Sequence, residues 1–302
     1  MEKNNFLDKY AKLLVIMAVL FGGLSGTFGA IISAPSSAIG FWRLTMSLPF
    51  FALPVFLSGE RRDKFTEIVK RERSTLIILV ATGFFLFMHF YLWYSAVKLT
   101  NVSGAAVLAS FHPLVVLFAT VFIYKRKVDK RAILCILVAL AAGAYMMSSD
   151  ISSILTGRML GNLFALGSGI SMGLYFAVGG KVRAKVDGAV YVFIVFASCW
   201  VCFLVSNIAL GAEFFGYPAK DYFYIACLAL FCQIGSHAIW NLCMGHVSPL
   251  YVSTVETADP VAATLLAILI IGQYPTVPEL ICCAVVVAAL LLYNRFENSG
   301  EK

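Results

Sequence analysis

The sequence predicts an all-α membrane protein in which ten transmembrane helices form two inverted five-helix repeats. Three observations predict this fold class. First, 61% of the 302 residues are hydrophobic and only 13% are charged, whereas about 25% of residues in a soluble domain are charged. Second, ten apolar stretches approach or exceed the roughly 20 residues that a helix needs to cross a bilayer. Third, the second half of the chain repeats the first at a constant offset.

The apolar stretches are continuously apolar rather than alternating, which favours helices over a β-barrel. The ten predicted spans are residues 13–33, 37–58, 75–97, 102–124, 131–148, 159–180, 189–210, 222–244, 248–271 and 278–293. Lys3, Lys9 and Lys12 precede the first span, as in a signal peptide. Its apolar part is too long for one and nine more spans follow, so we expect it to be retained.

The basic residues are distributed by topology. Nineteen of the 23 Lys and Arg fall at the two ends of the chain or in alternate loops on the same side as those ends, three fall on the opposite side, and Arg43 lies within a span. Because Lys and Arg favour cytoplasmic segments, both ends are predicted to be cytoplasmic in an inner or plasma membrane. The net charge of +7 therefore does not indicate a nucleic-acid partner.

An internal repeat appears when the sequence is shifted by 147 residues. Trp93 then aligns with Trp240 and Pro113 with Pro260. Between these landmarks no gap is needed, since WYSAVKLTNVSGAAVLASFHP lies over WNLCMGHVSPLYVSTVETADP. The shared offset and the matching hydropathy indicate a duplication.

The two halves, residues 1–150 and 151–302, hold five spans each, and together they form one transport domain. Five is odd, so the second copy is predicted to lie upside down relative to the first. Such inverted repeats place a binding site near the middle of the membrane, where the repeats meet. His112 and Asp259 are repeat mates, and each directly precedes a proline. We therefore expect them to face each other across a central cavity.

Span nine carries two acids, Glu256 and Asp259, three residues apart and so on one helix face. A charged side chain at a helix centre costs about 2.5–3.5 kcal/mol on insertion scales. Both acids are therefore predicted to bind substrate, with hydrogen bonding between helices as the alternative. Two ionised acids this close repel, so we expect one to be protonated. Together with His112, these acids permit transport that is coupled to proton movement. The alternative is facilitated diffusion of the solute without proton coupling.

Span eight carries Gln233, His237 and Asn241 at intervals of four residues. This polar stripe is predicted to face the cavity, with interhelical hydrogen bonding as the alternative. The repeat mates of the stripe are Leu86, Phe90 and Tyr94. A cavity with one hydrogen-bonding wall and one aromatic wall suits an amphipathic solute, such as an amino acid with an apolar or aromatic side chain.

Further candidate substrate-binding residues lie in spans two, three and eight. His89 and Trp93 are one turn apart in span three, Tyr94 follows them, and Trp240 is the repeat mate of Trp93. Arg43, near the start of span two, is expected to extend to the membrane interface. The alternative is a carboxylate partner, supplied by the protein or by the substrate.

Two stretches of small residues, GGLSGTFGA (22–30) and GSGISMG (167–173), allow close helix packing. Ser168, Ser171 and Tyr175 share a face of span six and are weaker candidates for the site. Cys199 and Cys202 are spaced as in CxxC, but they lie within a span without the strand and helix of a redox motif. We therefore interpret them as packing residues.

The sequence resembles the drug/metabolite transporter superfamily, EamA family, of the ten-helix type. The resemblance rests on Arg43, on YLWYSAVKLTNVSGAAVLASFHPLV (91–115) and on YVSTVETADPVAATLLAILIIG (251–272). The family often has an acid just before the proline of span nine, and Asp259 fills that place. The resemblance implies export or exchange of small metabolites, commonly amino acids, without ATP hydrolysis.

The sequence lacks the GxxxxGK[ST], HExxH and GxSxG motifs and any loop long enough for a soluble catalytic domain. No cofactor, metal or enzymatic activity is therefore predicted. We expect a secondary transporter that binds a small-molecule substrate within the lipid bilayer by alternating access, as a monomer or weak dimer. The alternatives are an intramembrane enzyme using His, Asp and Glu, a multidrug or cation efflux carrier, and a passive channel.

Overall fold

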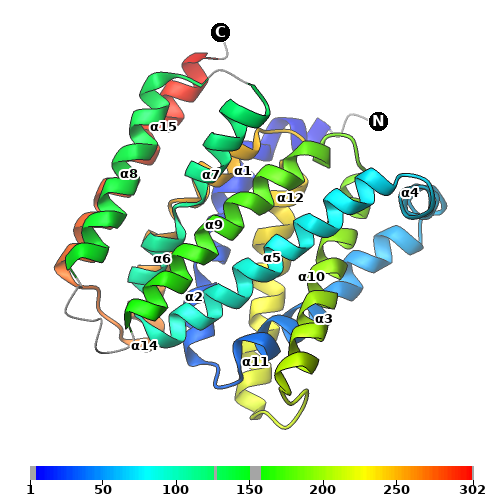
Figure 1. Cartoon of the computed structure of the whole chain (residues 1–302), viewed down its shortest axis with the longest axis horizontal. Helices are drawn as coiled ribbons and strands as arrows, with labels where there is room; N and C mark the ends of the chain where they lie inside the picture. Colours follow the sequence, from blue (N-terminus) through cyan, green and yellow to red (C-terminus); the bar gives the residue numbers. More distant parts are fainter. Residues whose placement is uncertain (1–4, 126–127, 150–157, 301–302) are drawn as a thin grey trace.

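The computed structural model describes residues 5–125, 128–149 and 158–300, and the regular elements within these ranges are all helices (Figure 1). The helices of the first half are α1 (Asn5–Gly22), α2 (Leu24–Ile31), α3 (Ser36–Phe56), α4 (Gly59–Lys70), α5 (Arg73–Leu99), α6 (Val102–Ala109), α7 (His112–Phe118), η1 (Ala119–Ile123) and α8 (Lys130–Ser149). The helices of the second half are α9 (Arg158–Arg183), α10 (Gly188–Leu210), α11 (Ala219–Cys227), η3 (Leu228–Ala238), α12 (Ile239–Cys243), α13 (Pro249–Glu256), α14 (Asp259–Ile271) and α15 (Val277–Gly300).

The predicted spans and the observed helices coincide. Among the described residues, eight helical stretches are long and apolar enough to cross a membrane, and each overlaps one predicted span. Helices α8 and α15, of 20 and 24 residues, occupy the fifth and tenth predicted spans. The prediction of an all-α membrane protein is confirmed, and several of the spans consist of two or three shorter helices in line.

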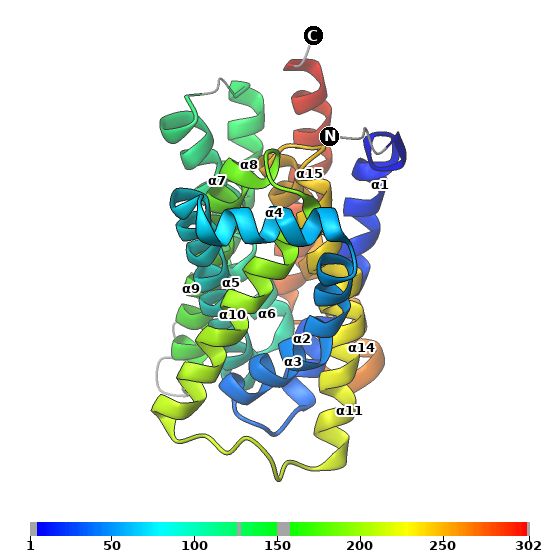
Figure 2. The same cartoon turned by 90° about the vertical axis from the view of Figure 1, so that its right-hand side faces the viewer.

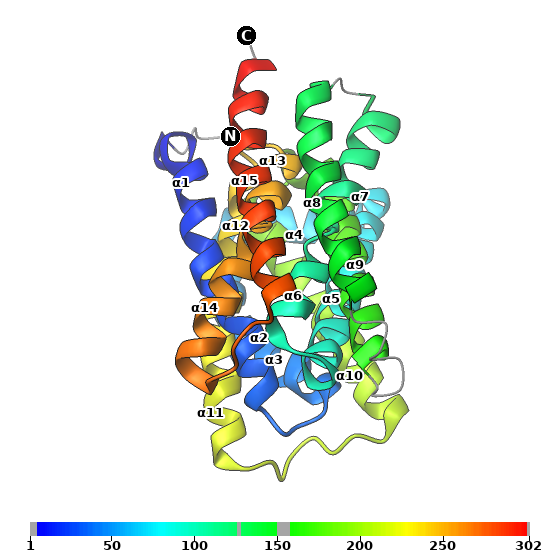
Figure 3. The same ribbon diagram turned by 90° about the vertical axis from the view of Figure 1, so that its left-hand side faces the viewer.

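The two halves run in opposite directions. The start of α1, the helix α4 and the end of α15 lie at one end of the bundle, and α11 begins near the other (Figures 2 and 3). We call these the α4 end and the α11 end. Helices α1 and α2 run from the α4 end toward the α11 end, whereas α9, which opens the second half, runs the opposite way.

The halves interlock rather than lie side by side. Helix α9 packs along α5 and against α6 and α7, and α1 packs against η3, α12, α13 and α14. The first helix of each half therefore buries its apolar surface on the third and fourth spans of the other half. Helices α3 and α10 also pair, as do α8 and α15 (Figure 1).

Spans four and nine are broken where the sequence predicts. Helix α6 ends at Ala109 and α7 begins at His112, with Pro113 in its first turn. Helix α13 ends at Glu256 and α14 begins at Asp259, with Pro260 in its first turn. Proline fits a first helical turn, but it lacks the N–H that would continue the hydrogen-bond ladder of the preceding helix.

Hydroxyl groups next to the breaks donate to backbone carbonyl groups in the last turn of the preceding helix. The hydroxyl of Ser110 donates to the carbonyl of Val107 at 2.7 Å, and that of Thr257 donates to the carbonyl of Thr254 at 2.6 Å. These hydroxyl groups thereby find hydrogen-bond partners inside the protein, where no water is needed.

Three local features were not predicted. A turn at Gly23 separates α1 from α2, and a Cβ at this position would lie 2.7 Å from the Cβ of Ala262. Only glycine therefore lets the first span come this close to α14. The segments η1 and η3 are π-helical. π-Helical turns are rare, and they occur frequently at functional sites.

A carboxylate joins the two halves at the α11 end. Asp221, in the first turn of α11, is almost fully buried. Its Oδ2 accepts hydrogen bonds from the backbone N–H of Ser33 at 3.0 Å, the hydroxyl of Ser33 at 2.6 Å and the backbone N–H of Ala34 at 2.9 Å. These bonds fix the connection between α2 and α3 to the second half.

We predict that Asp221→Ala lowers the thermal unfolding midpoint of the purified protein. The substitution leaves the buried N–H of Ala34 without its acceptor, which costs on the order of 1–3 kcal/mol, and it removes two further bonds from the exposed Ser33. The measurement is thermal unfolding in detergent, with Lys220→Ala as the matched control because Lys220 is the exposed neighbour of Asp221. Equal midpoints for the two variants would contradict a stabilising role for Asp221.

Candidate functional site

A cavity lies between the two halves at the level of the helix breaks. Both halves line it, and its volume is about 40 Å³. The lining residues are Gly22, Ser25, His89, Trp93, Ala106, Ala109, Ser110, His112, Met172, His237, Trp240, Glu256 and Asp259. About 10–15 Å³ of such space holds one water molecule, and sites for drug-sized ligands measure about 300–1,000 Å³. The cavity therefore has room for a few waters but not for a drug-sized ligand.

The predicted repeat mates His112 and Asp259 meet in this cavity. Each is the first residue of its helix, at the break that the following proline makes. His112 Nε2 lies 3.7 Å from Glu256 Oε2, which is longer than a hydrogen bond. Asp259 Oδ1 and Glu256 Oε2 are buried without a hydrogen-bond partner in the described part of the chain. Two acids and an imidazole thus converge with hydrogen-bonding capacity to spare.

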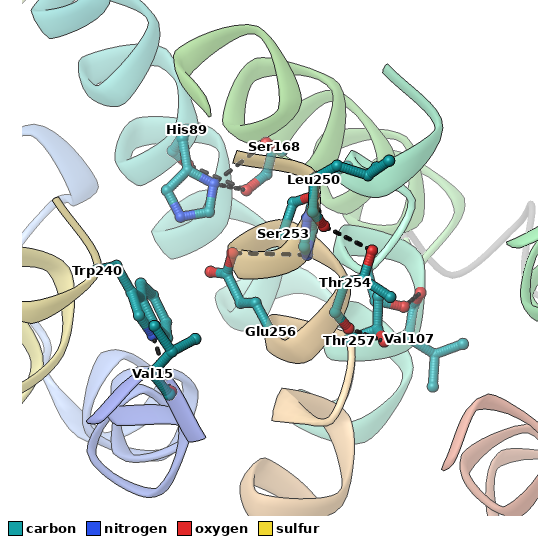
Figure 4. A network of polar contacts seen from close by, with 12 residues as sticks. Val15, His89, Val107, Ser168, Trp240, Leu250, Ser253, Thr254, Glu256 and Thr257 are labelled. Atoms are coloured by element: carbon teal, nitrogen blue, oxygen red, sulfur yellow. Dashed lines mark hydrogen bonds and ion pairs between the residues drawn. The ribbon is translucent and has the colours of Figure 1, made fainter. Parts of the chain in front are cut away.

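His89 is held to the second half by Ser168 (Figure 4). The hydroxyl of Ser168 donates to the carbonyl of His89 at 3.1 Å, and His89 Nδ1 lies 3.1 Å from the carbonyl oxygen of Ser168. His89 Nδ1 also lies 2.9 Å from the Ser168 hydroxyl, so which atom donates depends on the tautomer of the ring. Ser168, a weaker candidate from the sequence, therefore positions a cavity residue.

The two tryptophans are anchored through their indole N–H groups to the first span. Trp93 Nε1 donates to the hydroxyl of Ser25 at 3.2 Å, and Trp240 Nε1 donates to the carbonyl of Val15 at 3.3 Å (Figure 4). The His237 ring packs edge-on against Trp240, with centroids 5.1 Å apart. These contacts fix both indole rings as apolar walls of the cavity.

The polar stripe of span eight does not stay on one face. His237 lines the cavity, whereas Gln233 and Asn241 are fully buried outside its lining. The physical reason is the π-helix η3, whose i→i+5 hydrogen bonds wind the backbone more loosely than an α-helix. A spacing of four residues therefore no longer marks one face. The amide of Asn241 instead donates to the carbonyl of His237 at 2.7 Å.

Arg43 does not extend to the membrane interface, so that expectation was wrong. Its side chain is fully buried, with Nη1 donating to the Tyr94 hydroxyl at 2.6 Å and the guanidinium lying 4.1 Å from the centroid of the Phe90 ring. The aromatic residues of α5 hold the side chain inside the bundle. Tyr94 is turned toward Arg43 rather than into the cavity lining. The alternative prediction was a carboxylate partner, and among the described residues no Asp or Glu forms an ion pair with Arg43.

Several cavity residues were not singled out from the sequence. They are small or flexible: Gly22 and Ser25 in the first span, Ala106, Ala109 and Ser110 before the first break, and Met172 in α9. The first two lie in the predicted stretch of small residues, which was interpreted as packing. Of the other weak candidates, Ser171 and Tyr175 are buried in α9 outside the cavity lining.

A second, larger hollow lies at the α4 end. This groove has a volume of about 1660 Å³ and is lined by α4, the start of α1 and the connection between α9 and α10. Arg183 stands at its inner wall and donates to the carbonyls of Asn241 at 2.5 Å, Leu242 at 2.9 Å and Val186 at 3.2 Å. A cation bonded to the last carbonyls of a helix is favourably placed. Arg183 therefore fixes the end of α12 beside the groove.

Comparison with known proteins identifies the family. The model of the EamA-like transporter family matches residues 9–149 and 159–295. The chain belongs to the EamA-like transporter family. The two matches correspond to the two five-helix halves, so the predicted resemblance is confirmed, and so is the architecture of two inverted repeats.

A solved structure supports the fold of this EamA-like protein. A protein crystal structure with 17% sequence identity superposes with a TM-score of 0.69, covering 97% of this chain and 99% of the other. At that identity the likeness concerns the fold alone. No curated protein matches the sequence. Family membership makes the protein a multi-pass membrane transporter of small molecules.

We predict that Gly169→Ala destabilises this EamA-like transporter. A Cβ at Gly169 would lie 2.3 Å from the backbone oxygen of Ala109, at the end of α6. A backbone atom cannot move aside as a flexible side chain does, so the contact of α9 with the first helix break must open. Overpacking of this kind costs about 1–3 kcal/mol.

The measurement is the yield of monodisperse protein and its thermal unfolding midpoint. Gly59→Ala is the control, because a Cβ at Gly59 would have no atom within 4 Å. Unchanged stability of the Gly169 variant would mean that this close approach of α9 to α6 does not contribute to the fold.

Proposed function

We propose that the protein is a secondary transporter that exports or exchanges small metabolites by alternating access around the central cavity. We further propose that the solutes are amino acids with apolar or aromatic side chains. The observation that carries the proposal is the cavity itself, which lies between the halves and receives residues from both helix breaks. Two unpaired carboxyl oxygens, three imidazole rings and two indole rings offer polar and apolar contacts to one small solute.

The size of the cavity supports alternating access over an open channel. A space of about 40 Å³ cannot hold an amino acid, so solute entry requires helices or side chains to move. Interlocked halves provide such a movement, because rocking one half against the other opens one end as it closes the opposite end. Helix α12 connects the two hollows, since Trp240 lines the cavity and Leu242, two residues further on, lines the groove at the α4 end.

The charge distribution supports a cytoplasmic α4 end. Helix α4 carries Arg61, Arg62, Lys64 and Lys70, and Lys and Arg concentrate in cytoplasmic segments. With this orientation the groove faces the cytoplasm and the bonds of Asp221 close the external side. The membrane is then an inner or plasma membrane.

Proton coupling is part of the proposal. Buried carboxyl groups at mid-membrane are typical of proton relays in transporters, and His112 lies 3.7 Å from Glu256. A solute bound beside these groups would change their hydration and so the energy of their charged forms. Asp259, at the start of α14, is the residue that we assign to carry the proton.

We predict that Asp259→Asn abolishes solute movement driven by a pH gradient and preserves counterflow. Asparagine keeps the size of the side chain but carries no proton between the two sides, and exchange of labelled for unlabelled solute needs no net proton movement. The measurement is uptake of a panel of metabolites, amino acids first, into proteoliposomes with and without a pH gradient. Asp63→Asn, on the exposed face of α4, is the control.

Three other results would count against parts of the proposal. Normal gradient-driven uptake by the Asp259 variant would remove Asp259 from coupling. Non-saturable flux without counterflow would indicate a channel. Formation of a chemically altered product without movement would indicate an enzyme.

We also predict that His237→Ala raises the KM for a transported amino acid with an aromatic side chain. The imidazole packs against both Trp240 and Phe90 and lines the cavity, so its loss removes a wall of the site. The loss of one such contact is expected to weaken binding about tenfold. The measurement is concentration-dependent counterflow, and an unchanged KM would exclude His237 from the site.

A further inference from the structure

Arg43 is a buried cation with unused hydrogen-bonding capacity. Its Nη1 bonds the neutral hydroxyl of Tyr94, while Nε and Nη2 have no partner in the described part of the chain. Guanidinium keeps its proton at all pH values that proteins meet. The contact with Phe90 offsets part of the cost of burial, but it gives the two free donors no acceptor.

The two free nitrogens lie on the same edge of the guanidinium group. The Nε–H and one Nη2–H bond point in the same direction, and this edge binds both oxygens of a carboxylate in a bidentate pair. A side chain that served only packing would not need this edge to be free. The free edge therefore fits a planar anion such as a carboxylate, and no described side chain of the protein supplies one to it.

Other unpaired polar atoms occur on η3, which packs against α3, and on α2, which packs against η3. They are both amide atoms of Gln233, the hydroxyl of Ser236 and the hydroxyl of Thr27. Helix α3, which carries Arg43, packs against η3, and η3 packs against α2. Gln233 and Ser236 belong to the π-helical η3, and π-helical turns occur frequently at functional sites. Buried polar groups are normally satisfied, so these exceptions on neighbouring helices are consistent with a place for a polar ligand.

One layer of side chains separates Arg43 from the central cavity. The Phe90 ring contacts the guanidinium on one side and the His237 ring on another, at a centroid distance of 4.8 Å. The Tyr94 hydroxyl that bonds Arg43 is also close to Ser25. His237 and Ser25 both line the cavity. A movement of Phe90 and Tyr94 would therefore bring the free edge of Arg43 into contact with a bound solute.

We propose that Arg43 binds the carboxylate of the transported solute through Nε and Nη2 once Phe90 and Tyr94 move aside. This inference rests on the proposed transport function and deepens it, because it assigns the solute a carboxylate and gives that group a receptor. The apolar part of the solute then lies against Trp93 and Trp240. The competing source of a carboxylate is the protein itself, since Asp259 or Glu256 would pair with Arg43 in a different conformation.

The test uses three probes that differ in one charged group each. They are phenylalanine, 3-phenylpropionate, which lacks the ammonium group, and phenethylamine, which lacks the carboxylate. Transport of each is measured in proteoliposomes for the wild type, Arg43→Gln, Arg43→Lys and the control Arg62→Gln, which changes an exposed arginine of α4. We expect Arg43→Gln to raise the KM of both carboxylates by at least about tenfold. Phenethylamine transport and the control variant should remain unchanged.

Comparing the probes with and without a carboxylate shows whether Arg43 binds the solute or an acid of the protein. If Arg43→Gln impairs all three probes equally, its partner is an acid of the protein, and the proposal is overturned. Unchanged transport of all three overturns it as well. Should the Gln variant fail to fold, Arg43→Lys decides, because lysine keeps the charge but loses the bidentate edge. A raised KM for the carboxylates alone supports the proposal, and an equal change for all probes overturns it.

The same probes separate this inference from the transport function. If the wild type moves phenethylamine but neither carboxylate, transport stands and the role of Arg43 is overturned. If it moves none of the three, the proposed class of solute is wrong. Binding is then measured as the change in the thermal unfolding midpoint on addition of 3-phenylpropionate. Stabilisation of the wild type but not of the Arg43 variants then supports carboxylate binding, and no stabilisation of the wild type overturns it.

Discussion

Backbone groups that a helix break leaves unpaired find no water in the interior of a bilayer, and this constraint organises the protein. Pro113 and Pro260 break spans four and nine near the middle of their length. Such breaks are stable only where other helices cover them, so α9 crosses the first break and α1 packs on the second. The small residues at the crossings follow from this, as Gly169 shows by its approach to the carbonyl of Ala109. The cavity lies where the covered breaks meet.

The two halves share the helix breaks that form the cavity, and the residues that differ between them determine which groups line or surround it. The breaks, the prolines and the tryptophans recur in both halves. Asp259 stands where the first half has His112, and Arg43 has the apolar Val190 as its repeat mate. The inverted repeat thus places unlike groups on opposite sides of a pseudo-twofold axis. A site with unlike walls orients a solute that has one polar end and one apolar end, whereas two identical walls would not.

The sequence predicted features that depend on local chemistry and missed those that depend on contacts across the bundle. Proline acts on its own helix, so the breaks before Pro113 and Pro260 were predictable. The orientation of the Arg43 side chain depends on Phe90 and Tyr94, which belong to another helix. From the sequence, its position near the start of span two had predicted that the side chain extends to the membrane interface. The π-helical winding of η3 has no proline or glycine run to mark it, so Gln233 and Asn241 were placed on the face of His237. The pair of His89 and Ser168 joins different halves, which no spacing within one span reveals.

The bonds of Asp221 affect how readily the helices separate at the α11 end of the bundle. The carboxylate is bound by two backbone N–H groups and a hydroxyl, all of which water can replace with equivalent hydrogen bonds. Exchanging protein donors for water donors changes the free energy by only about 1 kcal/mol per bond. The positions of the three donors therefore select one position of the α2–α3 connection. The free energy of these bonds is small, because water hydrates the carboxylate of Asp221 once they break. In the transport cycle that we propose, thermal motion alone would therefore suffice to break and re-form these bonds.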